Sequence, residues 1–148
     1  FHGAARGIVA RIEKQPTGAG RSADSVTVTL ENGIIVATRG FPRDLIAANV
    51  AGVAQAIAAG GGNATRTHET INDLDQISTE LLQCSIVFDG SETIAILGKN
   101  SQTRRFKETC RGESVAFANT YWINGAGAMI RSSQAVAPDT GFLQLDRP

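Results

Sequence analysis

Residues 117–145, FANTYWINGAGAMIRSSQAVAPDTGFLQL, contain the only tryptophan and the only tyrosine of the chain and its clearest hairpin pattern. The run 115–123 is aromatic and β-branched, which is typical of a β-strand. Asn124-Gly125 follows, and this dipeptide between two apolar runs favours a tight hairpin turn with positive φ angles. We therefore predict a returning strand over 128–136, and we expect Gly125 to resist replacement by valine.

The same kind of pattern extends to both sides of this hairpin. Asn32-Gly33 and Asp89-Gly90 are two further hairpin signals. Apolar residues that alternate with polar ones predict short strands around them. The predicted strands are 7–13, 26–30, 34–38, 66–72, 79–88, 93–97, 103–109 and 142–146, the last preceded by a turn at 138–141.

One segment has a different period. Apolar residues of the stretch 44–58 recur at close to 3.6 residues, which predicts a helix. Asp44 is a candidate N-cap, and Gly60 is a candidate terminator. We expect this helix to cover one face or one mouth of the sheet, and the glycines 60–62 to act as a linker.

Short strands that follow one another through tight turns predict an antiparallel meander. A long meander usually curls, because open edges invite aggregation. The predicted fold class is therefore all-β: a meander curled into a deformed barrel, with one short helix, forming a single domain over 1–148.

The composition excludes several classes of function. The chain has 14 basic and 14 acidic residues, so no basic field argues for nucleic acid. The sequence has no phosphate-binding loop, no nucleophile elbow and no metal-ligand spacing around His2 or His68, which we interpret as surface imidazoles. We therefore expect no enzymatic activity, no cofactor and no metal. A pair of catalytic carboxylates could still hide among the scattered acidic residues, which leaves a hydrolase as an alternative.

The aromatic pair in the hairpin has two interpretations. Neighbouring residues of a strand face opposite sides, so one of Tyr121 and Trp122 is expected in the core and the other over a neighbouring strand. The sharper hypothesis is a sugar-stacking platform, because a flat aromatic ring beside amides and arginine suits carbohydrate binding. The candidate glycan-binding residues are Tyr121, Trp122, Asn124, Arg131 and Gln134.

Two segments of the hairpin carry a resemblance to a known family. Residues 117–124 (FANTYWIN) and 130–134 (IRSSQ), followed by Pro138, resemble the closing signature of the GfcB/YjbF family. These are lipoproteins of group 4 capsule or exopolysaccharide operons in Gram-negative bacteria. Residues 32–40, followed by Asp44-Leu45, and residues 103–110 resemble the family as well, so the likeness extends over most of the chain.

The resemblance implies an all-β fold, export, and a lipid anchor on the periplasmic side of the outer membrane. The anchor and one or more first strands would then lie outside this sequence. The implied role is non-enzymatic: an accessory to secretion or assembly of capsule or exopolysaccharide that binds glycan or proteins of the export machinery. A purely structural interaction module and a lipid carrier are alternatives.

Cys84 and Cys110 can form one disulfide, and the exported location implied by the resemblance favours it. In a flat meander the two residues would lie two strands apart, roughly 9 to 10 Å. A disulfide needs Cα atoms within about 7 Å. We therefore expect a bridge only if Cys110 folds back from the sheet; two separate buried thiols are the alternative.

Overall fold

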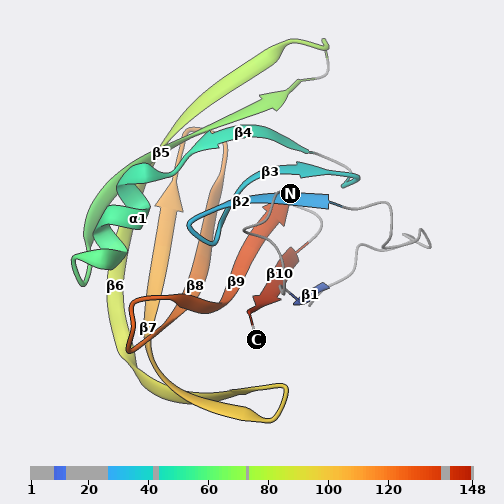
Figure 1. Ribbon diagram of the computed structural model, residues 1–148. Coiled ribbons are helices and arrows are strands. Elements are labelled where there is room, and N and C mark those ends of the chain that lie inside the picture. Colours follow the sequence, from blue (N-terminus) through green and yellow to red (C-terminus); the bar gives the residue numbers. More distant parts are fainter. Residues whose placement is uncertain (1–8, 13–26, 42–43, 73, 138–140, 148) are drawn as a thin grey trace.

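The computed structural model describes residues 9–12, 27–41, 44–72, 74–137 and 141–147 (Figure 1). Among these residues ten strands and one helix follow one another along the chain. They are β1 (Val9–Ile12), β2 (Thr27–Glu31), β3 (Ile34–Arg39), β4 (Leu45–Asn49), α1 (Ala51–Ala58), β5 (Gly62–Ile71), β6 (Ile77–Ile96), β7 (Lys99–Arg111), β8 (Ala116–Asn124), β9 (Met129–Ala137) and β10 (Gly141–Asp146).

Eight strands form one antiparallel sheet in the order β1-β10-β9-β8-β7-β6-β5-β4. From β4 to β10 each strand pairs with its neighbour in the sequence, so the predicted meander is confirmed. The sheet curls into a half-barrel, and β2 and β3 form a separate hairpin beside it (Figure 1). The described part of the chain contains no helix that is both long and apolar enough to span a membrane.

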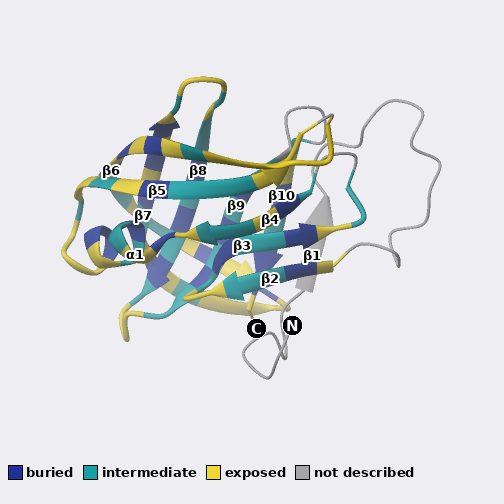
Figure 2. Cartoon of the chain, turned by 90° about the horizontal axis from the view of Figure 1, so that it is seen from above, coloured by how far each residue is buried: buried dark blue, intermediate teal, exposed yellow. Residues whose placement is uncertain are grey.

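The largest core cluster lies on the inner face of the curled sheet. It combines Val53 and Ile57 of α1 with Leu82, Phe106 and Tyr121 of the central strands. Figure 2 shows buried positions alternating with exposed ones along the strands that surround this interior, as the two-residue period of a strand requires. Helix α1 therefore covers the inside of the sheet, as expected.

The predicted start of the helix is wrong. Residues 45–49 form strand β4, which pairs with β5, and the helix begins only at Ala51. Asp44 does not cap the helix. Its carboxylate accepts hydrogen bonds from the backbone N–H groups of Gly40 and Phe41, and thereby closes the turn before β4.

The predicted end of the helix is confirmed. Gly60 has φ +92°, and its N–H donates to Ile57 O while the N–H of Gly61 donates to Ala56 O. These two bonds form a Schellman motif, which ends a helix at a left-handed residue. The glycine linker is shorter than expected, because Gly62 is already the first residue of β5.

The two strands predicted around Asp89-Gly90 are one strand, β6. The register of β6 against β7 shifts between Phe88 and Ser91, so the two residues form a bulge and not a hairpin turn. The chain reverses instead at Leu97-Gly98, where both residues have positive φ. As a result, the paired strands β6 and β7 make one long ribbon through the centre of the sheet.

Two of the predicted hairpin turns exist. In the first, Asn32 and Gly33 have φ +54° and +83°, as a two-residue turn of this type requires. In the second, Gly125 does not have a positive φ; the left-handed residue is Gly127, with φ +85°. This turn therefore has a longer loop than Asn-Gly alone suggests.

Candidate functional site

A buried ion pair lies at the centre of the inner face of the half-barrel. Arg66 of β5 and Glu108 of β7 are 4% and 0% exposed. Two guanidinium nitrogens of Arg66 donate to the carboxylate, with Nη2 2.7 Å from Oε1 and Nε 3.1 Å from Oε2. Such forked geometry is the strongest form of this pairing and offsets part of the cost of removing water from both charges.

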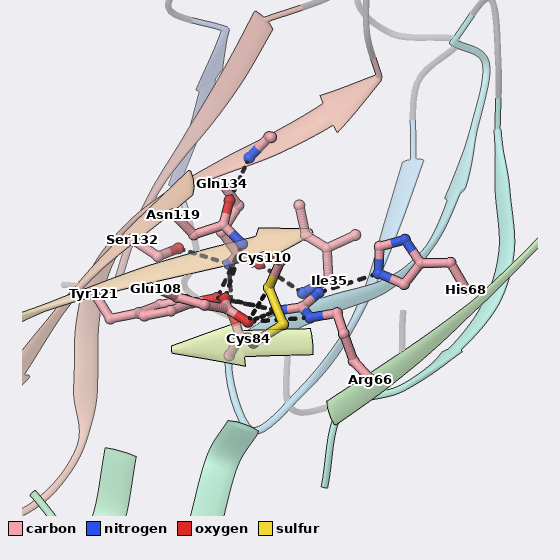
Figure 3. A network of polar contacts seen from close by, with 12 residues as sticks. Ile35, Arg66, His68, Cys84, Glu108, Cys110, Asn119, Tyr121, Ser132 and Gln134 are labelled. Carbon is pink, nitrogen blue, oxygen red and sulfur yellow. Dashed lines mark hydrogen bonds and ion pairs between the residues drawn. A yellow bond between two sulfur atoms is a disulfide. The ribbon is translucent and has the colours of Figure 1, made fainter. Parts of the chain in front are cut away.

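The same carboxylate accepts hydrogen bonds from a neighbouring strand (Figure 3). The Tyr121 hydroxyl donates to Glu108 Oε1 at 2.5 Å, and Asn119 Nδ2 donates to it at 3.0 Å. Complete burial, followed by the nearby Glu108 charge, raises the pKa of Tyr121 far above its ordinary value, so the phenol remains a donor. Glu108 is thus held from both sides by three side chains.

A disulfide between Cys84 and Cys110 lies directly beside this pair. The two residues face each other across β6 and β7, with their Cα atoms 4.1 Å apart. The bridge is as expected, but Cys110 does not fold back: the strands pair directly because β6 is continuous. The Cys110 sulfur lies 2.9 Å from Glu108 Oε2. Because both sulfurs are bonded to each other in the disulfide, the cluster of Cys84, Cys110 and Glu108 offers no thiolate to a metal.

His68 is not the surface imidazole that we expected. Its ring stacks on Phe117 with 5.6 Å between centroids, and its Nε2 lies 3.3 Å from Arg66 Nη1. Burial and the positive charge of Arg66 lower the pKa of His68 to about 4, against a smaller opposing effect of Glu80. The imidazole is therefore neutral at physiological pH. His2 lies outside the described residues.

A second polar group attaches the β2–β3 hairpin to the sheet. Gln134 of β9 is 2% exposed, and its side chain binds the backbone of β3. Its Oε1 accepts from Ile35 N–H at 2.9 Å, and its Nε2 donates to Gly33 O at 2.8 Å and to Ser132 Oγ at 2.9 Å. The Gln134 side chain thus joins the β2–β3 hairpin to β9, although β3 and β9 are not paired by backbone hydrogen bonds.

Next to this contact a pocket of about 780 Å³ opens at one end of the half-barrel; we call it the end pocket. Its lining comes from α1, from the β2–β3 hairpin, from β7, from the β8–β9 hairpin, and from the end of β10 with the residue that follows it. Ser132 belongs both to this lining and to the polar group around Gln134. A pocket of this size can enclose a ligand of several rings.

The lining of the end pocket is mixed. Alanine, isoleucine and leucine side chains supply apolar surface, and the amides of Asn32 and Gln55 supply donors and acceptors. The described charged residues of the lining are Arg104, Arg131, Asp146 and Arg147. Arginine is thus in excess at a site that also offers apolar surface, and guanidinium groups suit a ligand that carries carboxylate or phosphate groups.

The structure separates the five candidate glycan-binding residues. Tyr121 and Gln134 are buried and serve the internal polar groups described above. Asn124 Oδ1 accepts from the backbone N–H groups of Ala126 and Ala128, so it stabilises the β8–β9 turn. These three residues do not form an exposed platform with Trp122.

Trp122 and Arg131 are brought together as cross-strand partners of β8 and β9. Trp122 is half-buried, packs against a small cluster that contains Ile94 and Ile130, and donates from Nε1 to Glu92 at 3.0 Å. Arg131 pairs with Asp146, with Nε 2.6 Å from Oδ1. Of the five candidates, only Arg131 is in the lining of the end pocket.

Sequence reasoning missed Arg66 and Glu108, and it missed Arg104 and Arg147. The first two are 42 residues apart in the chain, and no local pattern joins them. One signal was present: Glu108 shares the inner face of β7 with Phe106 and Cys110, where an unpaired carboxylate is not tolerated. A buried cationic partner could have been sought on that basis.

Comparison with known proteins gives the same fold. The structure is similar to the crystal structure of the hypothetical lipoprotein YmcC from Escherichia coli (K12), with a TM-score of 0.69 and 20% sequence identity. The match covers 84% of this chain and 70% of that chain. A search of curated proteins finds no match.

A family model agrees with the structural comparison. The model described as group 4 capsule polysaccharide lipoprotein gfcB, YjbF matches residues 3–147. Because the match spans nearly the whole chain, this protein belongs to the gfcB/YjbF family of group 4 capsule polysaccharide lipoproteins.

Proposed function

We propose that this protein is a non-enzymatic accessory of polysaccharide secretion or assembly that binds a segment of the glycan in the end pocket. The family description names capsule polysaccharide, and this indicates the class of ligand. The observation that carries the proposal is the pocket itself: about 780 Å³, with both apolar and polar lining. Sugars need this mixture, because each ring has apolar C–H faces and a polar edge.

The arrangement of carboxylates supports a binding role over hydrolysis. Glycosidases generally place two carboxylates on either side of the scissile bond. Among the described residues, Asp146 is the one carboxylate of the pocket lining, and Arg131 holds it in an ion pair. Glu108 lies in the interior and is committed to Arg66. A hydrolase would need a second carboxylate in the pocket.

The location that fits this role is the periplasmic side of the outer membrane, reached through a lipid anchor. The family description as a lipoprotein supports the anchor. There the end pocket would hold nascent or exported polysaccharide near the proteins that transport it. No nucleic acid and no cofactor enters this role.

A partner of the export machinery is the second candidate, and one observation favours it. At the end of the β5–β6 hairpin, Ile71, Leu74 and Ile77 are 58%, 75% and 63% exposed. Clustered exposed apolar side chains are typical of surfaces that contact other proteins. A hairpin that contacts a partner and a pocket that binds glycan are compatible in one accessory protein.

The test of glycan binding is a pair of tryptophan substitutions in one helix turn. Ala58 and Ala59 are both exposed, but only Ala58 is in the lining of the end pocket. Isothermal titration calorimetry would measure the affinity of each protein for size-defined fragments of the extracellular polysaccharide of the source organism. We expect binding to the unmodified protein and to Ala59→Trp, and a loss of binding in Ala58→Trp.

Equal binding by the two tryptophan variants would show that the glycan does not bind in the end pocket. Absence of binding by the unmodified protein would leave the protein-interaction role. Release of reducing ends from the fragments during incubation would contradict the non-enzymatic assignment.

A further inference from the structure

The charges of the end pocket are not balanced, although those of the whole chain are. The sequence has equal numbers of acidic and basic residues, so no general positive field surrounds the protein. Within the described lining, three arginines accompany one aspartate. Arg131 and Asp146 neutralise each other through contacts of 2.6 and 3.1 Å. The excess positive charge therefore belongs to Arg104 and Arg147.

Arg104 lies on the inner face of the sheet. It pairs with Ile123 across β7 and β8, and Ile123 is also in the pocket lining. Its guanidinium lies over the ring of Phe106, with the central carbon 5.4 Å from the ring centroid. The described part of the chain places no carboxylate within ion-pair distance of Arg104. The ring thus positions a planar cation without neutralising it.

Arg147 follows directly after β10. Its backbone N–H donates to Ile130 O at 2.8 Å, which fixes the chain beside β9, and its side chain is exposed. It too has no carboxylate within ion-pair distance among the described residues. The two arginines therefore line the pocket from separate elements, Arg104 from β7 and Arg147 from the position after β10.

We propose that Arg104 and Arg147 make the end pocket selective for acidic sugars, and that each guanidinium pairs with a carboxylate carried by the glycan. A guanidinium matches a carboxylate with two parallel hydrogen bonds. The amides of Asn32 and Gln55 can bind hydroxyl groups, and Ala51, Ala54 and Ala58 of α1 offer apolar surface to the C–H face of a ring. This inference deepens the proposed function and depends on it.

The test compares trigalacturonic acid with its methyl ester, which has the same rings and no charge. Isothermal titration would measure both ligands on the unmodified protein and on Arg104→Gln, Arg147→Gln and the control Arg111→Gln. Arg111 is an exposed arginine of β7 that is not in the pocket lining. Urea unfolding of each variant checks that the fold is retained.

We expect the unmodified protein to bind the acid at least about tenfold more tightly than the ester, because each lost charge-assisted hydrogen bond is worth that much or more. Arg104→Gln and Arg147→Gln should each remove about tenfold of the affinity for the acid and leave the ester unchanged. Arg111→Gln should bind like the unmodified protein. Raising the salt from about 50 mM to about 500 mM should weaken binding of the acid only.

Three outcomes would overturn the inference. Equal affinity for acid and ester would reject the selectivity while keeping glycan binding in the pocket. Full displacement of the acid by inorganic phosphate at the same concentration would make the site a general anion site. Failure of both sugars to bind, while fragments of the native polysaccharide do bind, would show that acidity is not what the pocket recognises; failure of all three would contradict the proposed function itself.

Discussion

Arg66 and Glu108, 42 residues apart in the chain, form a forked ion pair inside the half-barrel, where neither side chain is more than 4% exposed. Tyr121 and Asn119 donate to the same carboxylate, so the charge is held by strands β5, β7 and β8 together. The ion pair and these two hydrogen bonds together therefore fix the relative positions of three strands across the curled sheet. Removal of one partner of this ion pair is expected to lower the free energy of unfolding strongly, because the other charge would remain buried without a counter-charge.

Glu108→Gln should destabilise the protein by about 3 to 5 kcal/mol, because it leaves the Arg66 charge buried without a counter-charge. The amide oxygen can still accept from Tyr121, so the loss reports the missing charge. Urea unfolding measures the change in the free energy of unfolding. The double variant Arg66→Met with Glu108→Gln should recover part of the loss; a single variant within 1 kcal/mol of the unmodified protein would contradict the buried ion pair.

The disulfide between Cys84 and Cys110 joins residues 26 positions apart. Closing a loop of that length stabilises a protein by about 3 to 4 kcal/mol through the unfolded state. The double variant Cys84→Ser with Cys110→Ser should lose roughly this amount in urea unfolding. Thiol titration of the unreduced, denatured protein should find no free thiol, and a count of two would show that the bridge is absent.

His68 makes stability depend on pH. Its folded-state pKa of about 4 lies below the ordinary value of 6.5, so the unfolded chain binds a proton first as the pH falls. The contribution to stability is full above pH 6.5 and is lost progressively as the pH falls from there to about 4, by at most about 3 kcal/mol. Arg66 and Glu80 are the charged groups that act on this imidazole.

His68→Phe is the matched variant, because a phenyl ring can keep the stack on Phe117 and does not titrate. Urea unfolding between pH 4 and pH 7.5 should give a flatter stability profile for this variant than for the unmodified protein. Identical slopes for the two proteins would show that His68 is solvated and does not lose its proton on folding.

The β8–β9 turn offers a comparison between two glycines, Gly125 and Gly127, that are two positions apart in the sequence. Gly127 has φ +85°, whereas Gly125 does not have a positive φ, and a Cβ at either position would meet no atom within 4 Å. Gly127→Ala should therefore cost about 1 to 2 kcal/mol through backbone strain alone. Gly125→Ala should be close to neutral, and thermal unfolding of both variants distinguishes them. A larger loss of stability in Gly125→Ala than in Gly127→Ala would indicate a two-residue turn at Asn124-Gly125, as the sequence predicted.

Local patterns were sufficient for much of the fold. Asn32-Gly33 specified its turn because the positive φ angles it requires are available to few other residues. Gly60 marked the end of the helix for the same reason. The predicted strands 128–136 and 142–146 match β9 and β10 to within one residue at each end.

Other features could not be read locally. Asp89-Gly90 has the composition of a hairpin turn, but the pairing of β6 with β7 on both sides of it makes it a bulge. Residues 45–49 follow a helical period by coincidence, and only pairing with β5 makes them a strand. The end pocket draws on residues from Leu30 to Arg147, so its lining depends on the curl of the whole sheet.

Hydrogen–deuterium exchange of the unmodified protein, with and without fragments of the extracellular polysaccharide of the source organism, tests glycan binding at the end pocket most directly. We predict slower exchange at three segments that line this pocket: α1, residues 32–34 and residues 128–132. Exchange that slows only around Trp122 and Glu92, or at the β5–β6 hairpin, with these three segments unchanged, would contradict it.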